Sequence, residues 1–164
     1  MKRIVPAIAV LAIAIAVVAS NSLSASNTAA ASGKSVTLHF VEKEAGFNYI
    51  DNPPRQGNNA PPLIGDEFAF SADLLNASNA HTGTFGATCM VARGGANPTL
   101  ICYGIYSLKG GDIIGMARGT NGNTTHIAIV GGTEAYEGVT GSSLEVSRGE
   151  DSPFTDVTVH LLYR

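Results

Sequence analysis

The sequence predicts an all-β domain, an eight-stranded antiparallel β-barrel. Short runs of β-branched and aromatic residues recur between clusters of Gly, Asn and Pro, a spacing that is typical of strands joined by turns. No stretch of helix length shows a clear 3.6-residue periodicity of apolar residues. Eight antiparallel strands can close into a barrel just wide enough for one small ligand, and closure removes the sheet edges that invite aggregation.

The strands follow one another along the chain, each bounded by turn-forming residues: Val36–Glu44, Glu67–Leu75, Thr82–Ala92, Thr99–Leu108, Asp112–Arg118, His126–Val130, Ser142–Arg148 and Thr155–Tyr163. The linker Ala45–Ile64 contains four prolines and cannot be a central strand, because proline lacks the amide proton that a ladder needs. We expect this linker to form a flap over one mouth of the barrel. The Gly-rich segment Arg93–Pro98 predicts a hairpin between the third and fourth strands.

The first 32 residues are interpreted as a signal peptide and a small-residue tract. Lys2 and Arg3 form a basic start, and residues 4–18 form an apolar run. This run is shorter than the roughly 20 apolar residues of a membrane-spanning helix, so cleavage without stable membrane insertion is expected, and a retained anchor is the alternative. Residues 33–164 are assigned to a single β-barrel domain, secreted or held in the cell envelope.

The charge of the chain argues against a nucleic-acid partner. Loss of the two positive charges of Lys2 and Arg3 takes the formal net charge from −3 to −5, and no basic cluster remains. The four histidines are scattered without ligand spacing, so no metal site is predicted. No serine or cysteine has a recognisable base partner or elbow motif, so hydrolase chemistry lacks support.

The two cysteines have three possible roles. Folding the hairpin about Gly95 and Ala96 places Cys89 opposite Cys102, and an exported chain favours a disulfide over two free thiols. Cys89 is otherwise a candidate catalytic thiol or a polarisable wall of a cavity. A disulfide would remove any thiolate role.

Several motifs occur in an order that resembles one known group of barrels. Ile129–Thr133 is similar to the "VGGT" signature of dirigent proteins, and Val157–Leu161 is similar to their last strand. Gly65–Leu74 and Gly86–Cys89 are more similar to plant allene oxide cyclases. From about Val36 to Tyr163 the chain resembles the allene oxide cyclase and dirigent barrel superfamily, as a bacterial exported member.

The resemblance implies an eight-stranded antiparallel barrel with a largely apolar cavity. It also implies a homotrimer and an activity that uses no metal or organic cofactor. The function expected on this basis is that of an isomerase or cyclase, which binds an apolar reactive small molecule and steers its cyclisation or isomerisation. A non-catalytic dirigent-like or lipophile-binding protein is the alternative, and a structural barrel filled by its own side chains is a third reading.

Glu42 is the candidate acid or base. If Leu38, Phe40 and Glu42 share the inward face of the first strand, burial in an apolar cavity would raise the pKa of the carboxyl group and suit it to proton transfer. A gapless match to the cyclases puts Phe40 at the position of their catalytic Glu. A match shifted by three residues puts His39 there instead, so that His39 and Val41 would line the cavity. The solvated end of a strand is the other reading of Glu42.

Aromatic side chains are expected to shape the cavity. Tyr103 and Tyr106 point to opposite faces of their strand, and Tyr106 shares its parity with Cys102. We therefore expect Tyr106 to point inward, with an ordinary role in the core as the alternative. The predicted substrate-binding residues are Phe40, Phe70, Phe85 and Tyr106.

Overall fold

The computed structural model describes residues 33–54, 61–119, 122–149 and 151–164. The predicted signal peptide, residues 1–32, lies outside the described residues. The strands are β1 (Ser35–Ile50), β2 (Glu67–Leu75), β3 (His81–Arg93), β4 (Thr99–Leu108), β5 (Gly111–Gly119), β6 (Thr124–Gly132), β7 (Thr140–Ser147) and β8 (Phe154–Leu162). One turn of 3-10 helix, η1 (Glu134–Tyr136), lies between β6 and β7.

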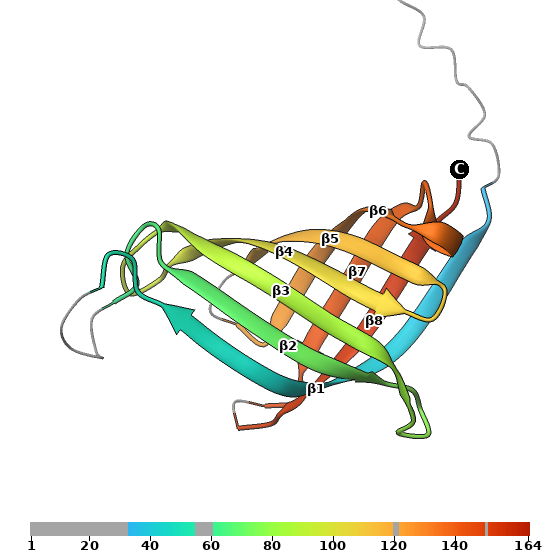
Figure 1. Ribbon diagram of the computed structural model, residues 1–164, viewed down its shortest axis with the longest axis horizontal. Coiled ribbons are helices and arrows are strands. Elements are labelled where there is room, and N and C mark those ends of the chain that lie inside the picture. The colour runs from blue at the N-terminus through green and yellow to red at the C-terminus, as the bar shows by residue number, and fades with distance from the viewer. Residues whose placement is uncertain (1–32, 55–60, 120–121, 150) are drawn as a thin grey trace, which may run out of the picture. The chain divides into compact units, whose positions relative to one another are not determined.

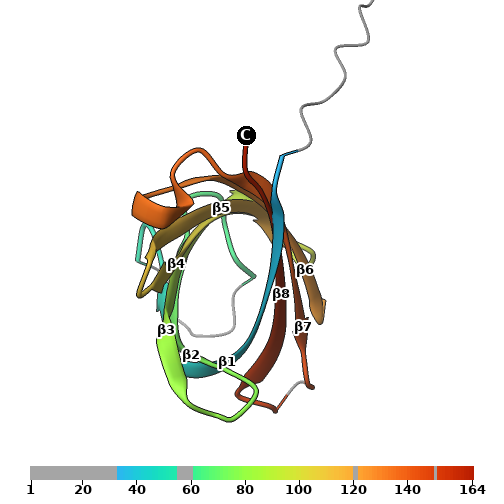
Figure 2. The same ribbon diagram turned by 90° about the vertical axis from the view of Figure 1, so that its right-hand side faces the viewer.

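The eight strands close into one barrel (Figures 1 and 2). Each strand pairs antiparallel with its neighbour in the chain, and β8 pairs with β1 to complete the ring. Hairpins can make every connection because sequential antiparallel strands need no crossover. The predicted fold class is confirmed.

The first strand is longer than the sequence pattern predicts. β1 continues through Gly46 to Ile50, which pairs with Glu67 of β2 after a bulge between Glu44 and Gly46. The prediction that the linker begins at Ala45 is therefore wrong. This segment of β1 is a strand because β2 pairs with it as far as Ile50. β1 ends shortly before Pro53, which has no amide proton for the ladder.

The loop after β1 is held by one buried carboxylate. Asp66 is fully buried and accepts hydrogen bonds from the Tyr49 hydroxyl and from the amides of Asn52 and Leu63. The amide of Gly95, in the β3–β4 hairpin, donates to the carbonyl of Pro62. These contacts pack the described part of the predicted flap against the strand ends at one mouth of the barrel. Residues 55–60 lie outside the described residues.

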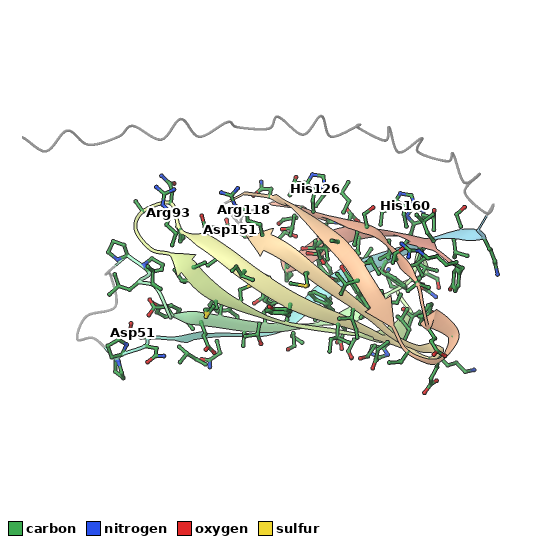
Figure 3. All side chains as sticks on the ribbon, turned by 90° about the horizontal axis from the view of Figure 1, so that it is seen from above. Asp51, Arg93, Arg118, His126, Asp151 and His160 are labelled. Atoms are coloured by element: carbon green, nitrogen blue, oxygen red, sulfur yellow. A yellow bond between two sulfur atoms is a disulfide. The ribbon has the colours of Figure 1, made fainter. Side chains whose placement is uncertain are left out.

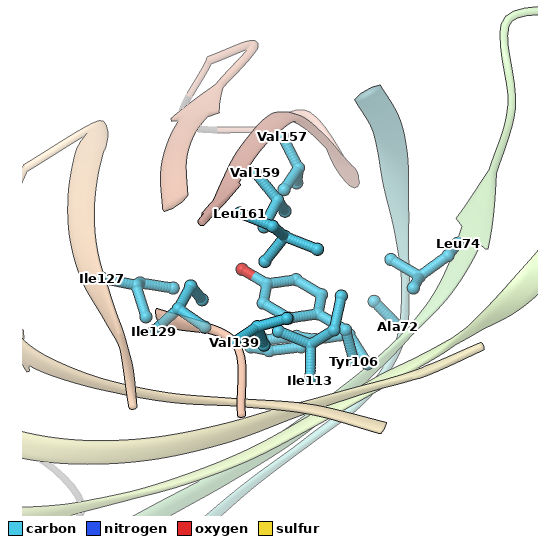
Figure 4. Close-up of a cluster of buried hydrophobic side chains, with 11 residues drawn as sticks. Ala72, Leu74, Tyr106, Ile113, Ile127, Ile129, Val139, Val157, Val159 and Leu161 are labelled. Carbon is cyan, nitrogen blue, oxygen red and sulfur yellow. The ribbon is translucent and has the colours of Figure 1, made fainter. Parts of the chain in front are cut away.

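Apolar side chains fill the half of the barrel nearest η1. Figure 4 shows the Tyr106 ring surrounded by aliphatic side chains from β2, β5, β6 and β8 and from the segment after η1. These residues alternate with less buried neighbours along the strands, as expected where one face of a sheet meets a core. The core comprises Ala72, Leu74, Phe85, Tyr106, Ile113, Ile127, Ile129, Val139, Val157, Val159 and Leu161.

The opposite half is hollow because its inward positions carry small residues. Gly104, Gly115 and Gly119 line a cavity together with Ala87 and Ala117. At Gly104, an added Cβ would lie 2.8 Å from the ring of Phe85. The absence of side-chain volume on β4 and β5 therefore lets Phe85 lie across the interior and leaves space beyond it.

Candidate functional site

Glu42 points into the barrel. Its side chain is only 6% exposed, and it lies on the same face of β1 as Leu38 and Phe40, which pack against the core. His39 and Lys43, on the other face, are exposed. The predicted inward face of β1 is therefore confirmed, and the alternative face with His39 is wrong.

A second carboxyl group lies beside Glu42. Glu145 on β7 is 8% exposed, and its side chain shares a hydrogen bond with that of Glu42. Glu42 and Glu145 flank β8 from opposite sides: Glu42 pairs with Thr155, and Glu145 pairs with Val157, two residues further along the same strand. Glu145 is therefore a second carboxyl group in the interior, in addition to the Glu42 that the sequence predicts.

The sequence pattern did not predict that Glu145 points into the barrel. The apolar residues of β7, Leu144 and Val146, are exposed, whereas the polar Ser143 and Glu145 are buried. Hydrophobic alternation alone assigns the two faces of this strand the wrong way round. Strand pairing could have identified Glu145 as an inward residue. The alternating pattern of β8 places Val157, Val159 and Leu161 on its inward face, and Glu145 pairs directly with Val157.

Tyr106 connects the carboxyl pair to the core. Its hydroxyl group donates a hydrogen bond of 2.6 Å to Oε1 of Glu145 and lies 3.1 Å from Oγ of Ser143. The ring is fully buried, so Tyr106 points inward as predicted. The aliphatic side chains around this ring in Figure 4 hold the hydroxyl group in place, which fixes the orientation of the Glu145 carboxylate.

The electrostatics of the pair favour a single shared proton. Burial raises the pKa of Glu42 to about 9, and the negative charge of Glu145 adds to this rise. Burial also raises the pKa of Glu145, but the hydrogen bonds that it accepts from Tyr106 and Glu42 oppose the rise. The pKa of Tyr106 is raised by burial and by the charge of Glu145, so its phenol stays protonated. Glu42 is therefore the member that holds the proton, and Glu145 is the member that ionises first.

The pair lies between two cavities. Glu42 lines a cavity of about 390 Å³ that opens between the β7–β8 hairpin and the paired strands β1 and β2. Glu145 lines a second, mainly apolar cavity of about 170 Å³ among β3, β4 and β5. Phe70 lines both. A ligand in either space therefore meets one member of the carboxyl pair.

Three of the predicted aromatic residues lie in a row. The ring centroids of Phe70 and Phe85 are 5.5 Å apart, and those of Phe85 and Tyr106 are 4.6 Å apart. Phe70 and Phe85 line the apolar cavity, whereas Tyr106 supports it from the core. Phe40 packs against the core and lines neither of these two cavities.

The cysteines form the predicted disulfide. Cys89 and Cys102 are directly paired on β3 and β4, and their sulfur atoms are bonded, so neither thiol is free. The proposed role of Cys89 as a catalytic thiol is therefore wrong, since a disulfide has no thiolate. The bonded sulfurs instead line the apolar cavity. Among the described residues, no group of three or more His, Cys, Asp or Glu side chains could hold a metal ion.

The arrangement suits acid–base chemistry on an apolar molecule. A protonated carboxyl group and a carboxylate that share a proton can act as general acid and general base from the same site. The apolar walls keep water away and strengthen the electrostatic interactions of both groups. The aromatic row offers a flat surface against which a ring system could pack.

Comparisons with known proteins place the fold. No family model and no curated protein matches the sequence. Among solved structures, the chain is similar to pyocyanin demethylase, with a TM-score of 0.65 and 22% identity over 77% of this chain and 99% of that one.

Two other similar structures are named for different activities. A pterocarpan synthase dirigent protein gives a TM-score of 0.63 and 17% identity over 79% of this chain and 96% of that one. An exo-specific intermolecular Diels–Alderase gives a TM-score of 0.60 and 16% identity over 78% of this chain and 99% of that one. The resemblance in the sequence motifs is thus confirmed at the level of the fold: the chain shares its closed barrel fold with these structures, which include a dirigent protein.

Proposed function

We propose that this barrel is an isomerase or cyclase that binds an apolar reactive small molecule and steers its rearrangement by proton transfer. The observation that carries the proposal is the buried Glu42–Glu145 pair at the junction of two cavities. Buried titratable groups with strongly raised pKa values in a cavity are characteristic of catalytic sites. The similar structures include a Diels–Alderase and a dirigent protein, which supports a barrel that directs ring formation.

The pair returns to its starting protonation state after each turnover. Glu42 donates its proton to one atom of the substrate, and Glu145 removes a proton from another. The proton then passes from Glu145 to Glu42 along the hydrogen bond between them. Substrate and product have the same composition, and the reaction needs no cofactor because the side chains supply both proton transfers.

The shape of the apolar cavity contributes to the proposed catalysis in addition to proton transfer. Phe70, Phe85 and the Cys89–Cys102 disulfide wall a narrow apolar space that would hold a flexible substrate in one folded conformation. A bound pose close to the reacting geometry can lower a barrier by several kcal/mol, up to about 7–11 kcal/mol in the best cases. This effect would select which ring or isomer forms.

A binding protein without activity is the competing function. The same apolar cavity could carry a lipophilic molecule without changing it, and the fold alone does not decide between the two. The buried carboxyl pair favours catalysis, because an apolar carrier gains nothing from two desolvated acids.

We further propose that the protein works outside the cytoplasm. The disulfide is compatible with an oxidising compartment. Within the described part of the chain, no helix has the length and apolar character needed to cross a membrane.

The test starts from molecules that co-purify with the protein, identified by mass spectrometry. Incubation of each with fresh protein should yield an isomer of unchanged mass in H₂O, and a deuterated isomer in D₂O. Glu42→Gln keeps the size of the side chain but cannot donate a carboxyl proton, so it should abolish the conversion. Glu137→Gln, an exposed position beside η1, is the matched control. Release of every bound molecule unchanged by the parent protein would favour the carrier function instead.

A further inference from the structure

One oxygen of the carboxyl pair has no partner. Oε1 of Glu42 is buried and makes no hydrogen bond among the described residues. The hydrogen bond between the two side chains raises the pKa of Glu42 and lowers that of Glu145, so Glu42 is its donor. This leaves Oε1 as a free carbonyl-type acceptor in a residue that lines the larger cavity. A buried acceptor without a donor is unfavourable, so Oε1 points to a ligand group with an N–H or O–H bond.

Among the described residues, no cationic side chain lies beside the pair to balance an ionised Glu145. All Lys, Arg and His side chains of the described residues are exposed, and none of them lines either cavity. Arg93, Arg118, His126 and His160 lie on the outside of the barrel in Figure 3. The hydrogen-bond partners that the structure gives the Glu145 carboxyl group, Tyr106 and protonated Glu42, are both uncharged. The other acid at the larger cavity, Glu44, is exposed and adds negative charge.

The unpartnered oxygen of Glu42 and the lack of a cation beside Glu145 call for the same kind of ligand group. A protonated nitrogen supplies both the missing positive charge and the missing donor, whereas a hydroxyl group supplies only the donor. We propose that the hollow half of the barrel binds a small organic cation, an apolar ring system whose N–H donates to Oε1 of Glu42 and whose charge lies beside Glu145. This inference rests on the proposed function, because it describes the ligand of the same site.

The walls of the site define the rest of the ligand. Phe70 and Phe85 present aromatic surface to the apolar cavity, and aromatic faces attract cations as well as ring systems. The apolar cavity, at about 170 Å³, accepts a compact body of fused rings, and the larger one leaves room for a polar substituent towards the mouth. A positive nitrogen also acidifies neighbouring C–H bonds, which would ease proton removal by Glu145.

Three naphthalene probes of nearly equal shape separate charge from hydrogen bonding. Naphthalen-1-ylmethylammonium has a charge and a donor, 1-naphthalenemethanol has only a donor, and 1-ethylnaphthalene has neither. Calorimetric titration of the intact barrel at pH 7 should show the ammonium binding about tenfold or more tighter than the alcohol, since hydrogen bonds to charged groups are the stronger ones. The alcohol should in turn bind more tightly than the hydrocarbon.

Variants assign the preference to the pair. In Glu42→Gln/Glu145→Gln the advantage of the ammonium over the hydrocarbon should disappear, while Glu137→Gln retains it. If the double variant fails to fold, the ranking of the three probes on the parent protein still decides the question. Equal or tighter binding of the hydrocarbon would overturn the cation inference and leave an apolar-binding barrel. Binding of none of the probes would count against both the inference and the proposed function.

Discussion

The hydroxyl group of Tyr106 donates a 2.6 Å hydrogen bond to the carboxylate of Glu145 inside the barrel. This bond joins β4 to β7 across the interior, between residues 39 positions apart in the chain. It orients Glu145 towards Glu42 and favours its charged form. The carboxyl pair therefore depends on Tyr106 as well as on its own two members.

Loss of this hydroxyl group should be costly. In Tyr106→Phe, Glu145 loses a donor while the ring still fills the core, so the free energy of unfolding should fall by about 1–3 kcal/mol. Tyr103→Phe, on the exposed face of the same strand, should change it by less than about 0.5 kcal/mol. Urea denaturation of the two variants measures the difference. Equal stabilities would show that the Tyr106 bond contributes nothing.

Stability should fall as the pH rises from mildly acidic to alkaline. The pKa of Glu42 is about 9 in the folded protein, against 4.5 as its ordinary value. In this window the folded state keeps a proton that the unfolded state has lost, so each pH unit costs up to about 1.4 kcal/mol of stability. The stabilisation from the proton on Glu42 is complete below pH 4.5, the ordinary pKa of the group. It is lost as the pH rises through about 9, the pKa of Glu42 in the folded protein.

Glu42→Gln should remove most of this pH dependence. Gln stays neutral at every pH and can still donate to Glu145, so the variant should match the parent protein near pH 5 and exceed its stability near pH 8. Calorimetric melting of both proteins across this range provides the comparison. A parent protein whose melting temperature rises steadily from pH 5 to pH 8 would contradict the buried, protonated state of Glu42.

The disulfide should be complete and stabilising. Thiol titration of denatured, unreduced protein should find no free thiol, because Cys89 and Cys102 are bonded. Replacing both by Ser releases a short loop, and chain entropy then predicts a loss of about 3 kcal/mol. Detection of two thiols in the unreduced protein would contradict the assignment.

The small side chains of the hollow half should control access by ligands. Ala117 lines the apolar cavity, so Ala117→Leu should fill space there and weaken binding of the naphthalene probes without touching the carboxyl pair. Ala128→Leu makes the same change on the exposed face of β6 and should leave binding unaltered. Similar affinities in the two variants would show that ligands do not enter this cavity.

A homotrimer remains a prediction from the family resemblance. The outer face of β3, β4 and β5 carries exposed apolar side chains that a neighbouring copy could cover: Met90, Ile101, Tyr103, Ile105 and Met116. Sedimentation at micromolar concentration should show one species heavier than a monomer, and Ile105→Glu should dissociate it by placing a charge in the interface. A monomeric parent protein would contradict the prediction.

Local patterns predicted most of the barrel. The strand bounds of β2 and β4 agree with the sequence pattern. The inward faces of β1 and β4 follow from period-two spacing, which puts Phe40 and Glu42 on one face of β1, and Cys102 and Tyr106 on one face of β4. The end of β1 was missed because the strand is extended by pairing with β2, which no local pattern records.

The candidate site was only half predictable. Glu42 lies in an alternating strand with apolar neighbours on its own face, whereas Glu145 lies in a strand whose apolar residues face outward. Their contact depends on the register of three strands, β1, β8 and β7. This register is set by the closed barrel as a whole, so it cannot be predicted from the sequence of any single strand.

The most direct test of the carboxyl pair is a titration of its protons. Carbon-13 NMR of protein labelled at the Glu carboxyl carbons, with Glu42→Gln and Glu145→Gln for assignment, follows both groups individually. We expect the signal of Glu42 to titrate near pH 9 in the parent protein, and at lower pH in Glu145→Gln, where the neighbouring negative charge is gone. Titration of both carboxyl groups near 4.5, unaffected by the other substitution, would contradict a shared proton and the catalytic role built on it.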